Sequence, residues 1–273
     1  MEGAGVLLKR AFGQADSYLD PFLLLDDFHS SDPKDYLSGF PWHPHRGIET
    51  ITYMLNGELK HGDSLGNEGV IGSGDVQWMT AGSGIIHEEM PKGQKNGLMW
   101  GLQLWANLPA SYKMMDPRYR EIKKINIPEL ILDNQIKIKI IAGQLNGIMG
   151  PVQDVVSDPE YFDVYIPPKT EFNYLIKKTH NAFAYIIGGK GYFDNNKSQL
   201  FGKEHLIIFE HGDKIMISTG SSELRFLLIS GEPIQEPVAW YGPIVMNTEE
   251  ELRIAFQEYR DGTFIKHKII KKN

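Results

Sequence analysis

The sequence contains no cysteine among its 273 residues. This absence excludes disulfide bonds, thiolate metal ligands and cysteine nucleophiles together. Long apolar runs are also missing, since none approaches the roughly 20 residues that span a bilayer. No basic segment followed by an apolar one begins the chain. We therefore expect a soluble, cytoplasmic protein that has no membrane partner.

Basic residues are fewer than acidic residues in this chain. The chain has 28 Lys and Arg residues against 35 Asp and Glu residues, which gives a formal net charge of -7. This balance argues against direct binding of nucleic acid, which needs a basic face. The basic end KHKIIKKN (266–273) is more typical of a solvated tail than of a DNA-binding arm. With 41% hydrophobic residues, the length suits one large domain or two of ordinary size.

Most of the chain has the pattern of short β-strands. Segments rich in Ile, Thr, Val and aromatic residues are bounded by turn residues such as Asn-Gly and Gly-Ser-Gly. The clearest are ETITYMLNG (49–57), DVQWMTAG (75–82), LMWGLQLWANLP (98–109) and IKIKIIAG (136–143). Many short strands at this spacing predict an all-β fold made of antiparallel sandwiches or barrels.

Helix signals are few. The segment MMDPRYREIKK (114–124) predicts one or two helical turns. A clearer helix is predicted in NTEEELRIAFQEYRDG (247–262), where Asn247 is a suitable N-cap and Glu250 completes a capping box. Its apolar stripe predicts a face that packs against a sheet.

Two pairs of segments suggest an internal duplication. Residues 49–63 align with residues 181–195, and residues 74–82 align with residues 212–220. A chance match of short β-patterns is the alternative, but two blocks in the same order favour a duplicated β-barrel. We expect a first domain over 1–130 and a second over 131–273, with the C-terminal helix in the second.

The stretch FPWHPHRGIET (40–50) carries two histidines one residue apart. An isolated pair of this kind is most often two surface imidazoles at a strand edge. Side chains alternate along a strand, however, so His43 and His45 face the same way and can share one ion. Pro44 would then point outward, at a sheet edge where its missing N–H costs nothing.

A second pair lies in GSGIIHEEMP (82–91), where His87 and Glu89 share a face and Glu88 points away. Alone, this pair is also more typical of exposed polar residues. Two such pairs on neighbouring strands of one barrel offer three imidazoles and one carboxylate. Together they predict a metal site.

The ligand types limit the metal only broadly. Imidazole and carboxylate without thiolate suit Fe, Mn, Co, Ni, Cu or Zn, whereas a closed structural zinc site would favour cysteine. Four protein ligands would leave positions for water, oxygen or substrate. Some large apolar residues are candidates for an aromatic pocket beside the metal, although packing in the barrel core is the commoner role of such side chains. They are Trp78, Trp100, Trp105 and Met99.

These motifs resemble those of the pirin family within the cupin superfamily. The resemblance runs from about residue 5 to residue 265 and rests on the segments DPFLLLDDF, HPHRGIETITYMLNG, GDVQWMTAGSGIIHEEMP, ISGEPIQEPVAWYGPIVMN and EEELRIAFQEYRDGTF. It implies a bicupin, that is, two antiparallel jelly-roll barrels. It further implies that the N-terminal barrel holds one metal, usually iron. Carried over by motif, the ligands are His43, His45, His87 and Glu89.

One alternative ligand remains open. Many cupins take a carboxylate from three or four residues after the first histidine pair, and Glu49 has that spacing and also the strand parity of His43 and His45. The resemblance favours Glu89 instead. Glu49 would then be a supporting or hydrogen-bonding carboxylate.

The second half lacks a matching set. In the alignment above, the four ligand positions fall on Leu175, Lys177, Arg225 and Leu227, none of which reproduces the site. We interpret His180, His205 and His211 as turn or surface residues. The C-terminal barrel is thus expected to be free of metal.

The resemblance implies two classes of function. The first is a quercetin 2,3-dioxygenase type of enzyme that opens a flavonol or related enol with O2, with Glu89 as the catalytic base. The second is a metal-bearing regulator that is not an enzyme and binds protein partners such as transcription factors. The acidic net charge favours protein contacts over DNA contacts in such a role.

Overall fold

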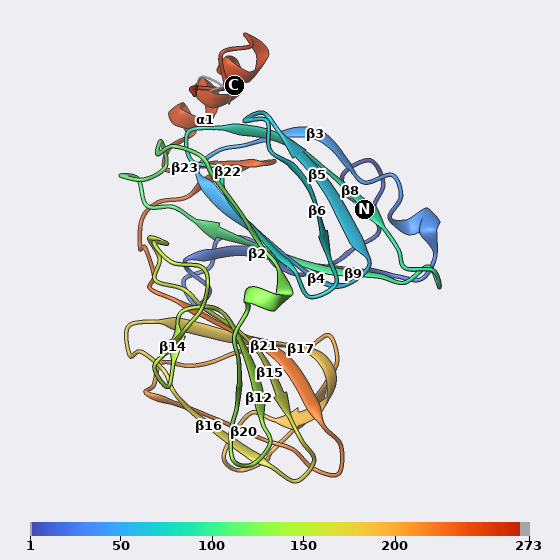
Figure 1. Ribbon diagram of the computed structural model, residues 1–273. Helices are drawn as coiled ribbons and strands as arrows, with labels where there is room; N and C mark the ends of the chain where they lie inside the picture. Colours follow the sequence, from blue (N-terminus) through green and yellow to red (C-terminus); the bar gives the residue numbers. More distant parts are fainter. Residues whose placement is uncertain (1, 268–273) are drawn as a thin grey trace. The chain divides into compact units, whose positions relative to one another are not determined.

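The computed structural model describes residues 2–267, in which β-strands predominate and a single α-helix lies near the C-terminus (Figure 1). The chain forms two compact units. The first contains residues 2–15, 22–124 and 234–267, and the second contains residues 16–21 and 125–233. Each unit has its own curled antiparallel sheets, which confirms the predicted all-β, two-barrel fold.

The first unit contains two large sheets and the small sheet of β22 (Ala239–Tyr241) and β23 (Ile244–Met246). One large sheet has the order β1-β2-β9-β4-β7-β10, with β1 (Lys9–Gly13), β2 (Phe22–Ser30), β4 (Ile48–Asn56), β7 (Val76–Thr80), β9 (Met99–Asn107) and β10 (Arg118–Ile122). The other has the order β3-β8-β5-β6, with β3 (Phe40–His45), β5 (Glu58–Asp63), β6 (Glu68–Gly72) and β8 (Ile85–Lys92). Short 3-10 turns occur at Pro33–Asp35 and Lys124–Asn126. Strand β3 is an edge strand, as expected from Pro44.

The second unit is one strongly curled sheet around an apolar core. Its main path runs β11-β12-β15-β21-β17-β20-β16. The strands on this path are β11 (Glu129–Ile131), β12 (Lys137–Ala142), β15 (Glu160–Ile166), β16 (Glu171–Leu175), β17 (Asn181–Tyr192), β20 (Lys214–Ser218) and β21 (Leu224–Gly231). Strands β18 (Leu200–Gly202) and β19 (Leu206–Ile208) pair with β17, and β13 (Gln144–Leu145) forms a hairpin with β14 (Ile148–Met149). Ile138, Phe162 and Phe226 in its core are completely buried.

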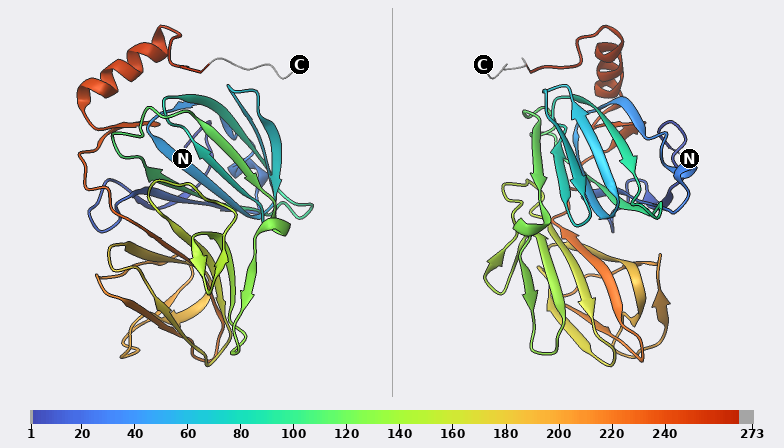
Figure 2. Two further views of the ribbon diagram at one scale, coloured as in Figure 1. Left: turned by 60° about the vertical axis from the view of Figure 1, so that its left-hand side comes forward. Right: turned by 45° about the vertical axis from the view of Figure 1, so that its right-hand side comes forward.

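The C-terminal segment differs from the expected domain division, which placed it in the second domain. It contains β22 (Ala239–Tyr241), β23 (Ile244–Met246) and α1 (Glu249–Arg260), and all three belong to the first unit (Figure 2). The apolar stripe of α1 explains this placement, because Leu252 and Ala255 share a buried cluster that also contacts Ile86 of β8. The chain therefore returns to the first unit after completing the second.

A buried arginine ties this segment to the end of β3. Arg46, only 2% exposed, forms a 2.7 Å ion pair with Glu258 and donates a 2.9 Å hydrogen bond to the carbonyl of Phe264. Its guanidinium also stacks 4.2 Å from the centroid of the Phe264 ring. The same packing covers the outer face of β3 and β8, so Pro44 is buried rather than pointing to solvent as expected.

Two local expectations are wrong. The helix is capped by Thr248 and Glu251, one residue later than expected, with both hydrogen bonds of the capping box present. The segment expected to form helical turns instead contains β10, because pairing with β7 over its whole length outweighs its local helix propensity. Within residues 2–267, no helix has the length and apolarity needed to cross a bilayer.

Candidate metal centre

Three histidines from two paired strands meet inside the first unit. His43 and His45 lie on β3, and His87 lies directly opposite His43 on β8. The Nε2 atom of His43 is 3.1 Å from Nε2 of His45 and 2.9 Å from Nε2 of His87. The three side chains form a group whose donor atoms all lie within 4.8 Å of one another. Strand alternation thus brings together the three imidazoles that the sequence singled out.

The hydrogen bonds made by the Nδ1 atoms of His43 and His45 determine which ring nitrogens carry a lone pair toward the centre of the group. Nδ1 of His43 lies 2.8 Å from the carbonyl of Pro41, and Nδ1 of His45 lies 3.0 Å from the carbonyl of Pro243. A carbonyl only accepts, so each of these Nδ1 atoms must carry the proton. In the neutral rings, both Nε2 atoms are therefore bare lone pairs, 3.1 Å apart.

Two lone pairs at this separation repel unless a cation or proton lies between them. Burial lowers the pKa of His43 and lowers the pKa values of His45 and His87 well below the usual range, with the neighbouring imidazoles adding to the effect at His45 and His87. Protonation is therefore disfavoured, and the rings are kept in the neutral form that binds metal. A divalent cation fits this arrangement, and the Nδ1–H bonds to carbonyls are the contacts that orient histidine ligands.

Glu89 is buried on the same face of β8 as His87 but lies outside the three-histidine group. Its Oε2 accepts a 2.9 Å hydrogen bond from Gln103 and its Oε1 accepts a 3.3 Å bond from Thr52. Burial raises the pKa of Glu89 to about 7, against the opposing effect of these two donors. A cation at the histidines would favour its ionised form. Glu88 is half-buried on the alternate face, as strand parity predicts.

Glu49 does not join the histidines. Its carboxylate accepts a 2.6 Å hydrogen bond from Thr80, on the face of β4 opposite to that of Thr52. Strand β3 ends at His45, and Gly47 has a φ of +78°, which glycine adopts without strain. The alternation of side chains along β3 is therefore interrupted before β4 begins. Counting residues from His45 thus does not show which way the Glu49 side chain points.

A cavity of about 920 Å³ is lined by His43, His45 and Glu89. Of the four candidate pocket residues, Trp105 lines it, with its ring 5.1 Å from that of His45 in an edge-on arrangement. Trp78 and Met99 are buried in packing, and Trp100 stacks on His29. The residues around β22 supply another wall, including Trp240, whose ring centroid is 5.9 Å from that of Trp105.

Sequence reasoning missed this contribution of the C-terminal segment. Pro243 orients His45 although 198 residues separate them, and Trp240 faces the cavity. The segment ISGEPIQEPVAWYGPIVMN (229–247) carries a family motif. No local pattern in it indicates that it returns to the first barrel.

The second unit has no counterpart of the histidine group. Strand β16 pairs with β20 as β3 pairs with β8, so the topology makes β20, and not the region around Arg225, the counterpart of β8. The buried apolar residues of this pair are Phe172, Tyr174, Ile215 and Ile217. The sequence alignment was thus displaced by one strand. The positions on β16 and β20 that correspond by topology carry apolar side chains, which do not bind metal.

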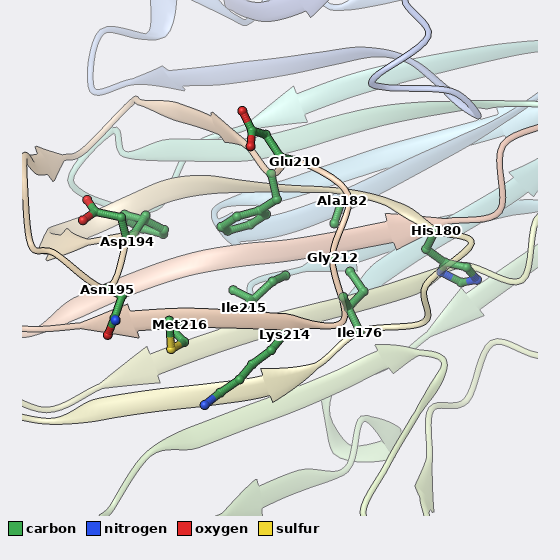
Figure 3. A pocket seen from close by; sticks show the side chains of 12 residues that line it. Ile176, His180, Ala182, Asp194, Asn195, Glu210, Gly212, Lys214, Ile215 and Met216 are labelled. Atoms are coloured by element: carbon green, nitrogen blue, oxygen red, sulfur yellow. The ribbon is translucent and has the colours of Figure 1, made fainter.

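The other histidines of the second unit have separate environments. His205 and His211 are exposed, as expected. His180 closes a turn through its backbone N–H to the carbonyl of Lys177, also as expected, but its side chain is buried, with Nδ1 3.1 Å from Ser230 Oγ. This unit has a pocket of about 200 Å³. Figure 3 shows His180 at one end of it and Asp194 at the other. Among the residues that the structure describes, His180 belongs to no group of three or more potential metal ligands.

We expect close to one metal ion per chain. Only the first unit combines several neutral imidazoles with a cavity, whereas the equivalent positions of the second unit are filled by its apolar core. Elemental analysis of purified protein measures the ratio directly. A value near two, with both ions held by side chains, would contradict this reading of the second unit.

Comparisons with known proteins point to one family. The pirin family model matches residues 5–106, and the model of the pirin C-terminal cupin domain matches residues 161–265. A pirin-like protein from Solanum lycopersicum is 44% identical over 96% of this chain and 88% of its own length. A protein from Thermoplasma acidophilum named "Putative quercetin 2,3-dioxygenase Ta0133" is 40% identical over 88% of this chain and 98% of its own length.

A solved structure extends the likeness to the whole fold. The structure described as quercetin 2,3-dioxygenase from Acinetobacter baumannii has a TM-score of 0.86 and 30% identity, and the match covers 98% of this chain and 94% of that one. The two family models together match most of the residues, and the relatives named above are well above 30% identical along nearly the full length. The chain therefore belongs to the pirin family.

Proposed function

We propose that this chain is a metal-dependent dioxygenase of the quercetin 2,3-dioxygenase type, acting on flavonols or related enols. The observation that carries the proposal is the three-imidazole group, in which the Nε2 lone pairs of His43 and His45 face inward, beside an aromatic-walled cavity of about 920 Å³. A cavity of this size accommodates a small aromatic substrate. Names of relatives with 40% and 30% identity support the same reaction class.

His43, His45 and His87 would hold the metal, with Glu89 as a fourth ligand. We propose Fe(II), following the family, and the donor set is equally suited to Mn, Co, Ni, Cu or Zn. When bound, the metal supplies a positive centre that acidifies an enolic hydroxyl and holds its oxygen. Each Glu89 oxygen accepts one hydrogen bond, from Gln103 or from Thr52, and keeps a second lone pair with which it could bind the metal.

The protein residues have three tasks in this reaction. Glu89 accepts the proton of the enolic hydroxyl, because it is a buried carboxylate that shares the cavity with the histidines and, unlike the buried Asp26 of the same cavity, is not paired with an arginine. Trp105 and Trp240 provide flat apolar walls that orient the aromatic substrate and exclude water. The overall reaction consumes one flavonol and one O2 and yields one ring-opened ester and one CO, so that all atoms balance.

The direct test is oxygen uptake by metal-reconstituted protein with a panel of flavonols and related enols. We expect uptake that requires both metal and an enolic hydroxyl, and none with the 3-deoxy analogues. If wild-type protein takes up no oxygen with Fe, Mn, Co, Ni or Cu, the dioxygenase proposal is wrong. The metal-bearing regulator of protein partners would then be the better hypothesis.

A further inference from the structure

Gln103 is the side chain that joins the cavity wall to Glu89. It lies on β9, opposite Thr52 of β4, and uses both ends of its amide. Its Nε2 donates a 2.9 Å bond to Glu89 and a 3.2 Å bond to Thr52. Its Oε1 accepts a 3.0 Å bond from the indole Nε1 of Trp105. Every polar function of this amide therefore has a partner.

Trp105 determines which way this amide faces. An indole N–H can only donate, so the group next to it must be the amide oxygen, which places the NH2 group against Glu89. A flipped amide would set an NH2 against the indole N–H and an oxygen against the carboxylate. Both of these contacts are repulsive, so the flip is disfavoured while Trp105 keeps its place.

The network also restrains both oxygens of Glu89. Thr52 accepts a hydrogen bond from Gln103 and donates one from its hydroxyl to Oε1, while Gln103 donates directly to Oε2. The Glu89 carboxylate thus has a fixed plane. Trp105 in turn meets His45 edge-on and lines the cavity, so one residue contacts both the candidate ligands and the amide that orients Glu89.

We propose that Gln103 is a positioning residue for Glu89 and that Trp105 fixes its orientation, so that the Trp105–Gln103–Glu89 series sets the geometry of the carboxylate toward the metal. This inference rests on the role given to Glu89 under the proposed function. It adds two residues that contact no metal themselves. Contacts of this kind typically change metal affinity by about 10- to 100-fold.

The test uses Co²⁺ as the probe, because its visible absorption reports the ligands around it. The first variant is Gln103→Met, which keeps the length of the side chain and removes all three hydrogen bonds. The second is Trp105→Phe, which keeps an aromatic wall and removes the N–H. The matched control is Trp240→Phe, whose indole N–H bonds to the carbonyl of Gly242 and not to Gln103.

We expect about 10- to 100-fold weaker Co²⁺ binding and an altered visible spectrum in Gln103→Met, and the same change of spectrum in Trp105→Phe. Trp240→Phe should bind Co²⁺ within about twofold of wild type, with an unchanged spectrum. If Trp105→Phe and Trp240→Phe give the same result, or Gln103→Met binds like wild type, the positioning role is wrong. Because Trp105→Phe is tested independently, a folding failure of Gln103→Met still leaves a decisive comparison.

The outcome can be separated from that of the proposed reaction. Oxygen uptake is measured on the same preparations with a flavonol. If wild type shows no uptake but Co²⁺ binding depends on Gln103 and Trp105 as described, the positioning role stands and the dioxygenase proposal fails. If wild type is active but both variants bind Co²⁺ normally, the reverse holds.

Discussion

Replacing His87 with alanine is expected to weaken metal binding by at least about 100-fold, since ligand loss costs more than loss of a supporting contact. His87 lies 2.9 Å from the Nε2 atom of His43, in the centre of the candidate site. The adjacent change Glu88→Ala should leave metal affinity within about twofold of wild type, because that side chain faces the opposite side of β8. Calorimetric titration of the metal-free form of each variant measures both metal affinities.

The pair of variants is matched in position and strand, so a general loss of stability at β8 would affect both. Equal losses from His87→Ala and Glu88→Ala would contradict the strand register on which the site depends. Normal metal binding in His87→Ala would show that the ion is held elsewhere.

The change Glu89→Gln should slow flavonol turnover by about 10²- to 10⁴-fold at saturating metal. The amide keeps the shape of the side chain but cannot accept the proton of the enolic hydroxyl. Three imidazoles remain, so metal binding should be weakened but not lost. Steady-state oxygen uptake, with metal content measured on the same sample, separates slow turnover from loss of metal.

Glu49→Gln is the matched control for this variant. Glu49 is also a buried carboxylate, but it bonds to Thr80 on the other face of its strand, so turnover should stay within about threefold of wild type. Undiminished turnover by metal-replete Glu89→Gln would remove Glu89 as the base. A large loss in Glu49→Gln alone would make Glu49 the carboxylate that matters.

Much of the first barrel could be predicted from local sequence because strands impose a strict alternation. This periodicity places His43 and His45 on one face of β3, and His87 with Glu89 on one face of β8. The structure shows both pairs inside the same barrel. The expected strand segments also agree with β4, β7, β9 and β12 to within two residues. Local signals of this kind do not depend on how distant segments pack.

The remaining features depend on contacts between distant segments. The alternation fails across Gly47, where the chain turns between two sheets, so the position of Glu49 could not be obtained by counting. Pro243 and Trp240 reach the site only because the helix after them packs on β8 and β23. Likewise, the strand equivalent to β8 in the second unit is identified by its pairing with β16 and not by sequence similarity.

The account is tested most directly by measuring carbon monoxide and oxygen together in a closed vessel during the reaction of Fe²⁺-loaded protein with quercetin. The proposed reaction predicts one CO released for each O2 consumed, and no more than background release from His87→Ala at the same Fe²⁺ concentration. Oxygen consumption without CO, or equal CO release from wild type and His87→Ala, would contradict a dioxygenase centred on the three histidines.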